Sequence, residues 1–320
     1  MGMTLTAKIL AVTGFCLTAT LAQAAGLRAI EVAGGPALTG AVWYPCSQSP
    51  AGVQLGNFIL PGVKDCPIEG RKLPLVVISH GRGGNFAGHH DTAAALADAG
   101  FVVAAIDHPG DTTFDLSRLY DFSVYVDRPV EIKRLIDFML GASPAAAAID
   151  PDRIGLFGFS RGGYTGLVAV GAEPHFALGL PLCEGSAQPV CEGIRNKRYP
   201  PSLVHDARIK AAVIADPPST FFDRDSLAGI KVPVQLWASQ AGGDGVAPES
   251  VAAVEKYLPA NHQYHVVANA GHFAFLAPCP PVMAKERPEL CADASGFDRV
   301  AFHAQLNAAV VAFFREHLKP

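Results

Sequence analysis

The chain has 320 residues and a formal net charge of −4 at pH 7. Half of the residues are hydrophobic and 17% are charged, with no basic stripe along the chain. This balance excludes the electrostatic footprint of a nucleic-acid-binding protein, so we expect no nucleic-acid partner. The length is sufficient for one large α/β domain built around a single sheet.

The first 24 residues have the features of a secretory signal peptide. Lys8 supplies a basic start, residues 9–21 form an apolar stretch too short to span a bilayer, and Ala22-Gln23-Ala24 is a small-x-small cleavage site. We therefore predict a signal peptide at 1–24 and a mature domain at 25–320, exported to the periplasm or the medium. A retained N-terminal anchor is the alternative, but the prediction is a protein with no stable membrane anchor.

Six cysteines remain once Cys16 is set aside with the signal peptide. An even number in an exported chain favours disulfides over scattered buried thiols. Three local pairings would each close a short loop, and we expect Cys46–Cys66, Cys183–Cys191 and Cys279–Cys291. No pair has the C-x-x-C spacing of a zinc site and no histidine is suitably spaced nearby, so the sequence predicts no metal site.

The hydrophobic pattern then alternates between strands and helices along the chain. An opening hairpin is predicted at 27–32 and 38–44, and a long loop at 45–72. Further strands are predicted at 73–79, 101–106, 154–159, 209–215, 232–238 and 263–267, and helices at 91–99, 126–140, 248–257 and 300–317. Continuous apolar strands separated by helices predict a mostly parallel central sheet with helices on both faces. In such sheets the chemistry lies at the carboxyl ends of the strands.

The stretch Gly158-Phe159-Ser160-Arg161-Gly162 lies between a predicted strand and a run of small residues typical of a helix. A strand, a tight turn and a helix would lift the Ser160 hydroxyl onto a sharp elbow, with the helix N-terminus facing developing negative charge. The two flanking glycines are needed because side chains there would collide with the neighbouring backbone. We predict that Ser160 is a nucleophile.

A serine hydroxyl needs a base, and a histidine base needs a carboxylate to orient it. His272 lies just past the last predicted strand and is the predicted base. Asp244, in a Gly-rich loop after strand 232–238, is the preferred carboxylate. Asp216, which follows the preceding strand, remains the alternative, although an Asp before Pro often caps a turn.

The Gly-rich turn His80-Gly81-Arg82-Gly83-Gly84 follows the strand at 73–79. Backbone amides in such a turn can point inward and stabilise the oxyanion of an acyl-transfer intermediate. We assign the two oxyanion donors to the backbone N–H groups of Arg82 and Arg161. His80 is expected to brace its loop rather than to titrate, and His89-His90 to bind no catalytic metal.

These motifs, with Trp43-Tyr44-Pro45, Asp107-His108-Pro109-Gly110-Asp111, Asp127-Arg128-Pro129 and Gly271-His272-Phe273, resemble the α/β-hydrolase superfamily. Within it the chain resembles secreted bacterial predicted dienelactone hydrolases, which are close to platelet-activating-factor acetylhydrolases and to bacterial lipases or polyesterases. The resemblance implies a serine esterase without a cofactor. True dienelactone hydrolases carry a cysteine nucleophile, whereas position 160 is serine. In acetylhydrolases of this kind the acid follows the strand after the elbow, which keeps Asp216 as a candidate.

The sequence therefore predicts an exported carboxylic-ester hydrolase acting on a small-molecule or lipid-like ester through a Ser-His-Asp triad and an acyl-enzyme. An amidase or peptidase, a polyester-degrading hydrolase and a non-catalytic binding protein are the alternatives. The segment 181–205, which holds two cysteines, is predicted to form a small disulfide-pinned cap or rim over the acyl pocket, with a surface excursion as the alternative.

Overall fold

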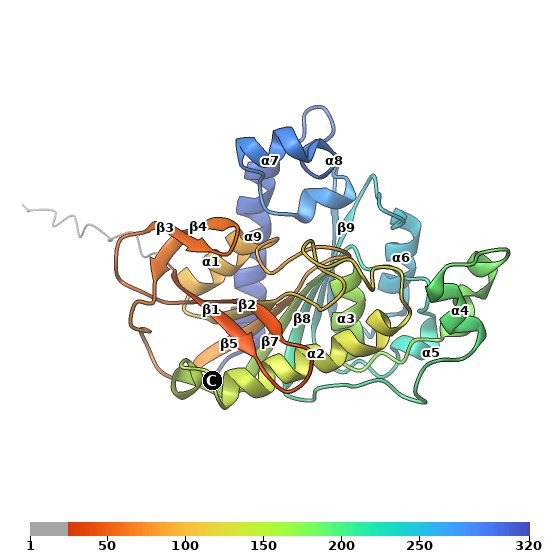
Figure 1. Cartoon of the computed structure of the whole chain (residues 1–320), viewed down its shortest axis with the longest axis horizontal. Helices are drawn as coiled ribbons and strands as arrows, with labels where there is room; N and C mark the ends of the chain where they lie inside the picture. The colour runs from red at the N-terminus through yellow and green to blue at the C-terminus, as the bar shows by residue number, and fades with distance from the viewer. Residues whose placement is uncertain (1–24) are drawn as a thin grey trace, which may run out of the picture.

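A computed structural model describes residues 25–320 as a large twisted sheet with helices on both faces (Figure 1). The predicted signal peptide at 1–24 lies outside the described residues. The strands are β1 (Gly26–Val32), β2 (Leu38–Tyr44), β3 (Ala51–Leu55), β4 (Phe58–Lys64), β5 (Leu73–Ser79), β6 (Val102–Ile106), β7 (Ile149–Phe159), β8 (Ile209–Ala215), β9 (Val234–Ser239) and β10 (His262–Val267). The α-helices are α1 (His90–Asp98), α2 (Ser123–Leu140), α3 (Arg161–Ala169), α4 (Pro189–Arg195), α5 (Arg224–Leu227), α6 (Pro248–Tyr257), α7 (Pro281–Glu286), α8 (Pro288–Cys291) and α9 (Arg299–His317).

The sheet order is β10-β9-β8-β7-β5-β6-β2-β1-β4-β3. From β10 to β6 all neighbouring strands are parallel, whereas β2 pairs antiparallel with both β6 and β1. The order reverses direction around β5, because the chain adds β6 on one side of it and β7 on the other. The carboxyl ends of β5, β7 and β8 thus lie side by side, which is where ligands bind in sheets of this kind.

Two hydrophobic cores cover the two faces of the sheet. Buried side chains of α2, α3 and α6 pack on one face together with alternate residues of the strands, such as Leu75 and Val77 of β5. Side chains of α1 and α9 pack on the other face against Val76 and Ile78 of the same strand. Central strands buried on both faces explain the continuous apolar runs in the sequence. The predicted fold class, a mostly parallel sheet between helices, is confirmed.

The predicted loop at 45–72 is wrong in its middle, because β3 and β4 form an antiparallel hairpin there. Its tight turn contains Gly56, whose φ of +56° suits glycine. Alternate residues of the hairpin, Val53, Leu55 and Leu60, are buried against the α1–α9 core. Pro61 and Gly62 lie within β4 and obscured the period-two pattern, because both residue types are depleted in strands.

The three predicted disulfide pairings are confirmed. Cys46–Cys66 ties the end of β2 to the segment after β4, Cys183–Cys191 joins the turn at Phe176–Cys183 to α4, and Cys279–Cys291 encloses α7 and α8. Figure 1 shows α7 and α8 projecting beyond the sheet, and α4 lying at its side. Of the three enclosed segments, α7 and α8 bury none of their residues, whereas the other two bridges lie within a hydrophobic core.

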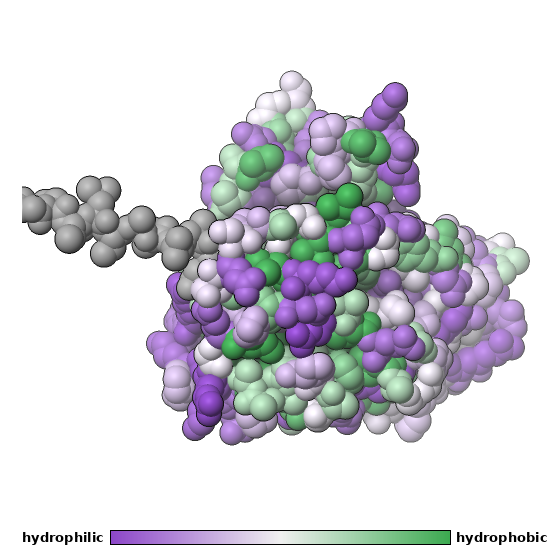
Figure 2. Space-filling model, turned by 60° about the vertical axis from the view of Figure 1, so that its left-hand side comes forward, coloured by the Kyte–Doolittle hydropathy of each residue, from purple (hydrophilic) through white to green (hydrophobic). Residues whose placement is uncertain are grey.

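The surface on the side of β3 and β4 carries apolar residues interspersed among hydrophilic ones (Figure 2). Among residues 25–320, no helix is long and apolar enough to cross a membrane.

A set of hydrogen-bonded polar side chains connects α1 to α9 on the face of the sheet that these two helices cover. His303 of α9 contacts a carboxylate oxygen of Asp91 through Nδ1 at 2.7 Å and the carbonyl oxygen of Ala274 through Nε2 at 2.8 Å. His303 thus connects the two segments through both of its ring nitrogens. Burial on its own would raise the pKa of Asp91, but hydrogen bonds from His303 and Asn307 outweigh it and lower the pKa to about 2.

A carboxylate with a lowered pKa contributes stability that is complete above its unfolded pKa and is lost as the pH falls through its folded pKa. We expect Asp91→Asn to lower the free energy of unfolding by about 2 kcal/mol at pH 7. The difference from the wild type should shrink as the pH falls from about 4 towards 2. Urea unfolding at several pH values measures it, and a difference independent of pH would contradict the assignment. Asp98→Asn, at the other end of α1, is the control.

Candidate active site

Ser160 lies at a sharp elbow between β7 and α3, with φ +55° and ψ −122°. A positive φ is strained for a non-glycine residue and is characteristic of functional positions. A Cβ at position 162 would overlap the carbonyl oxygen of Ser79, and one at position 158 would overlap the carbonyl oxygen of Gly162. The flanking glycines are therefore required by close backbone approach, as the sequence indicated.

The Ser160 hydroxyl lies 3.0 Å from Nε2 of His272. On the other side of the ring, Nδ1 of His272 lies 3.0 Å from a carboxylate oxygen of Asp216. All three residues are buried, with Ser160 6% exposed and Asp216 fully enclosed. The arrangement has the contacts that allow an imidazole to take the serine proton while a carboxylate fixes its tautomer.

The structure places Asp216, rather than the preferred Asp244, beside His272. Asp216 follows β8 and has its carboxylate held by the backbone N–H of Ser239 at 2.7 Å and by the Ser239 hydroxyl. Asp244 instead forms an ion pair with the side chain of Arg82. The prediction of Asp244 as the partner of His272 is thus contradicted by the geometry, and the alternative that the sequence left open is the one that contacts the ring.

The backbone of the Gly-rich loop after β9 explains why Asp244 is displaced. The carbonyl oxygen of Gly242 accepts the backbone N–H of His272 at 2.8 Å. A Cβ on Gly243 would lie 3.2 Å from Cβ of His272, so the main chain itself fills the space beside the histidine. The next residue, Asp244, is directed away towards Arg82. The glycines serve close packing of backbone against the base rather than delivery of a carboxylate.

The loop after β5 lies against Ser160. A Cβ on Gly81 would be 3.2 Å from Cβ of Ser160, so the residue directly before Arg82 lies against the serine. Within residues 25–320, the backbone N–H of Arg82 donates to no protein acceptor. Arg161 is the first residue of α3, where an N–H has no partner inside the helix. Both predicted oxyanion donors are available, and their role stays a prediction.

His80 holds the shape of this loop. Its Nε2 accepts the backbone N–H of His108 at 3.1 Å, so its proton resides on Nδ1, which donates to the carbonyl oxygen of Gly81 at 2.7 Å. Burial, reinforced by the positive charge of Arg128, keeps the pKa of His80 well below its usual range. The residue is a neutral brace in the structure, in agreement with the expectation from the sequence.

A buried ionisable network beneath the loop was not assigned any role by the sequence. Arg128 donates to the carbonyl oxygens of His80 and Gly81, at 2.8 and 3.2 Å. His108 lies 2.6 Å from Glu131, and burial raises the pKa of that carboxyl to about 7. Arg128 and His108, but not Glu131, belong to motifs that supported the family resemblance. Spacing alone did not reveal their contacts, because α2 meets the loop only after the sheet has assembled.

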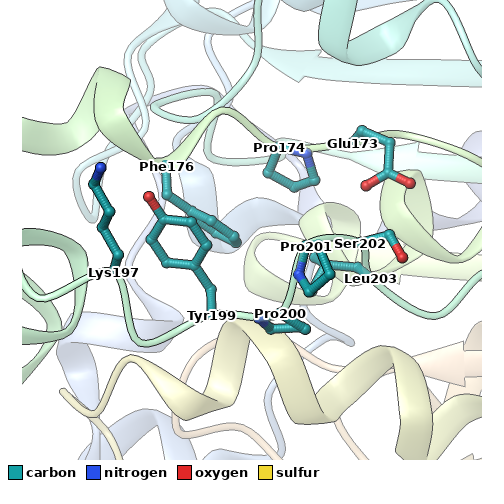
Figure 3. A pocket seen from close by; sticks show the side chains of 9 residues that line it. All are labelled: Glu173, Pro174, Phe176, Lys197, Tyr199, Pro200, Pro201, Ser202 and Leu203. Atoms are coloured by element: carbon teal, nitrogen blue, oxygen red, sulfur yellow. The ribbon is translucent and has the colours of Figure 1, made fainter.

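Two surface pockets lie away from these residues. One pocket, of about 370 Å³, is shown in Figure 3. Its lining includes Phe176, which precedes the predicted cap at 181–205, and Tyr199 and Leu203, which lie near the end of that segment. Another, of about 680 Å³, runs along the edge strand β10. None of Ser160, His272 and Asp216 lines either pocket. In the described part of the chain, no group of three or more histidine, cysteine or acidic residues is arranged to hold a metal ion.

Comparisons with known proteins agree with this architecture. Residues 88–182 match the model of the prolyl oligopeptidase family, and residues 47–117 match that of platelet-activating factor acetylhydrolase, isoform II. The platelet-activating factor acetylhydrolase of Canis lupus familiaris is 25% identical over 171 residues, which covers 40% of this chain and 38% of the relative. The chain thus spans well under half the length of the curated relative that it matches.

A ferulic acid esterase from Streptomyces cinnamoneus superposes with a TM-score of 0.65 at 18% identity, covering 94% of this chain and 91% of the esterase. That likeness establishes the fold over nearly the whole chain. The chain has the α/β-hydrolase fold, and the predicted resemblance to that superfamily is confirmed. Part of the chain is also similar to platelet-activating factor acetylhydrolases.

The two aspartates can be separated by the reactivity of Ser160. We expect Asp216→Asn to slow labelling by a fluorophosphonate by roughly 10³- to 10⁴-fold, because the imidazole then loses its fixed tautomer. Asp244→Asn should slow it less than about tenfold, since that carboxylate contacts Arg82 instead. Labelling rates from intact-protein mass spectrometry measure both. The opposite ranking of the two variants would restore Asp244 as the acid.

Proposed function

We propose that the protein is a serine hydrolase of carboxylic esters. The observation that carries the proposal is the hydrogen-bonded series Ser160–His272–Asp216 at the carboxyl edge of the sheet. The acetylhydrolase family match and the fold shared with a ferulic acid esterase support an ester as the substrate class. No cofactor enters the proposed reaction.

In the proposed mechanism, Oγ of Ser160 attacks the ester carbonyl carbon while Nε2 of His272 takes its proton. The backbone N–H groups of Arg82 and Arg161 hold the resulting oxyanion. Collapse of the tetrahedral intermediate expels the alcohol, which receives the proton from His272, and leaves an acyl-enzyme. His272 then deprotonates a water molecule that releases the acid. Asp216 stabilises the imidazolium in both steps.

The rim near the nucleophile supports apolar substrates. Gly83 of the oxyanion loop lies against Leu116 and Leu119, and the guanidinium of Arg82 lies 5.9 Å from the centroid of the Tyr120 ring. Leu116 and Tyr120 are about half exposed. These side chains offer apolar surface beside the proposed oxyanion site.

We further propose that segment 181–205 acts as a rim, as the sequence indicated. We also propose that the enzyme works in an oxidising compartment, where its three disulfides persist.

The nucleophile is tested with p-nitrophenyl acetate and butyrate. Ser160→Ala should reduce turnover to the background rate, because it removes the hydroxyl that contacts Nε2 of His272. Ser143→Ala, at a buried serine that bonds only to its own turn, serves as the matched control and should retain turnover. Full activity of Ser160→Ala in the steady-state assay would refute the nucleophile.

Amide or peptide hydrolysis is a second candidate, favoured by the match of residues 88–182 to the prolyl oligopeptidase family. The same triad can serve both reactions, so the two candidates are distinguished by whether the enzyme prefers an ester or an amide leaving group. We expect kcat/KM for p-nitrophenyl butyrate to exceed that for the corresponding p-nitroanilide by at least about 10³-fold, roughly 4 kcal/mol in transition-state stabilisation. Comparable values on the two substrates would favour the amidase or peptidase, and the wild-type enzyme suffices for the measurement.

A further inference from the structure

Two arginine side chains meet one aspartate in the interior beneath the oxyanion loop. Asp111 accepts a hydrogen bond from Nη1 of Arg161 at 2.7 Å and lies 3.1 Å from Nη2 of Arg128. Asp111 is fully buried, and the side chains of Arg128 and Arg161 are 1% and 7% exposed. Burying charges costs several kcal/mol per ion, and a buried ion pair is weak evidence for stability. The location of this cluster therefore calls for a functional explanation.

Asp111 connects the two segments that carry the proposed oxyanion donors. One oxygen of its carboxylate contacts the side chain of Arg161, whose backbone N–H is one donor. The other oxygen accepts the backbone N–H of Gly83 at 2.9 Å, directly after Arg82, which carries the second donor. A single carboxylate thus links the elbow helix to the loop after β5.

Arg128 completes the clamp from α2. It donates to the carbonyl oxygens of His80 and Gly81, which precede Arg82, while Asp111 accepts the N–H of Gly83 after it. The cluster therefore holds the peptide groups on both sides of Arg82. These contacts direct the two carbonyl groups towards the guanidinium. The Gly81 carbonyl and the Arg82 N–H belong to one planar peptide group, so holding the carbonyl oxygen also fixes the direction of the Arg82 N–H. An oxyanion hole needs that direction set before the reaction.

The cluster also carries charge. Two guanidinium groups face the carboxylate of Asp111, so these three buried side chains together carry one net positive charge. Burial lowers the pKa of Arg128 to about 10, so this residue stays protonated at neutral pH. A fixed positive charge behind the amides favours the negative charge that develops on the substrate oxygen. Ground-state ester binding gains little from it, because the ester is neutral.

We propose that Asp111, with Arg128 and Arg161, is a positioning cluster for the oxyanion hole that stabilises the transition state and not the bound substrate. The proposal rests on the proposed ester hydrolysis. It assigns to three side chains a role in turnover that they perform through the backbone amides of Arg82 and Arg161. Asp111 itself touches no reacting atom.

The experiment compares Asp111→Asn with Asp107→Asn. Asp107 is a buried carboxylate on the same segment that accepts the backbone N–H of Phe86 at 2.8 Å, and neither of its hydrogen bonds involves a guanidinium. For p-nitrophenyl butyrate, Asp111→Asn should lower kcat about 10- to 10³-fold with KM within about threefold of the wild type. Asp107→Asn should keep kcat within about fivefold while losing thermal stability.

A trifluoromethyl ketone provides the readout that a merely structural role would not move. Ser160 adds to its carbonyl carbon, the carbon–oxygen double bond becomes an oxyanion, and His272 takes the serine proton. The affinity of Asp111→Asn for an alkyl trifluoromethyl ketone should fall in parallel with kcat/KM. Its affinity for the matching methyl ketone, which binds without addition, should be unchanged.

Equal losses in both aspartate variants, or a kcat of Asp111→Asn within threefold of the wild type, would overturn the proposal. If Asp111→Asn does not fold, Arg161→Met replaces it, because that variant removes one guanidinium and leaves the Arg128–Asp111 pair; it is judged by the same split between kcat and KM. A wild-type protein that neither hydrolyses esters nor reacts with a fluorophosphonate refutes the proposed function instead. An active wild type with an unaffected cluster variant refutes this inference alone.

Discussion

The close approach of main chain to main chain at the elbow is the constraint on which the rest of the site depends. Position 162 lies against the carbonyl group of Ser79 at the end of β5, and position 158 against the start of α3. Only glycine tolerates both contacts. Because the backbone can pass so closely, Ser160 takes a positive φ and its hydroxyl reaches the edge of the sheet, while the loop after β5 comes to lie beside it. A larger residue at either position would separate the nucleophile from the loop that is proposed to hold the oxyanion.

Around that elbow, the histidine is held from two directions. The carbonyl oxygen of Gly242 accepts its backbone N–H, and the turn that follows it is tied to α9 through the contact between Ala274 and His303. His303 in turn contacts Asp91 at the start of α1. The base is thereby connected to helices on the far side of the sheet from α3. Rigid support of this kind is what a proton transfer over about 3 Å requires.

Features with local causes could be predicted from the sequence. The central strands are continuous apolar runs because both faces of the sheet are covered, and the glycines at 158 and 162 have steric reasons that a short motif reveals. The disulfide pairings followed from short loop lengths. The identity of the carboxylate that contacts His272 did not follow in this way. Both Asp216 and Asp244 stand after strands, and the choice depends on whether side chain or main chain fills the space next to His272. That is decided by the path of the loop after β9, which composition and spacing do not specify.

The charged cluster of Asp111, Arg128 and Arg161 is a further feature that could not be predicted from the sequence. Asp111, Arg128 and Arg161 are far apart in the chain and lie on a loop, on α2 and on α3. In a one-dimensional pattern each is an ordinary charged residue, and helical periodicity would place an arginine on the solvent side. Only the assembled sheet shows that α2 and α3 turn their arginines towards one carboxylate under the loop after β5. The desolvation cost of that arrangement must be offset by its contacts. Because those contacts hold the peptide groups around Arg82, the energy spent on burying charge is linked to the geometry of the proposed oxyanion hole.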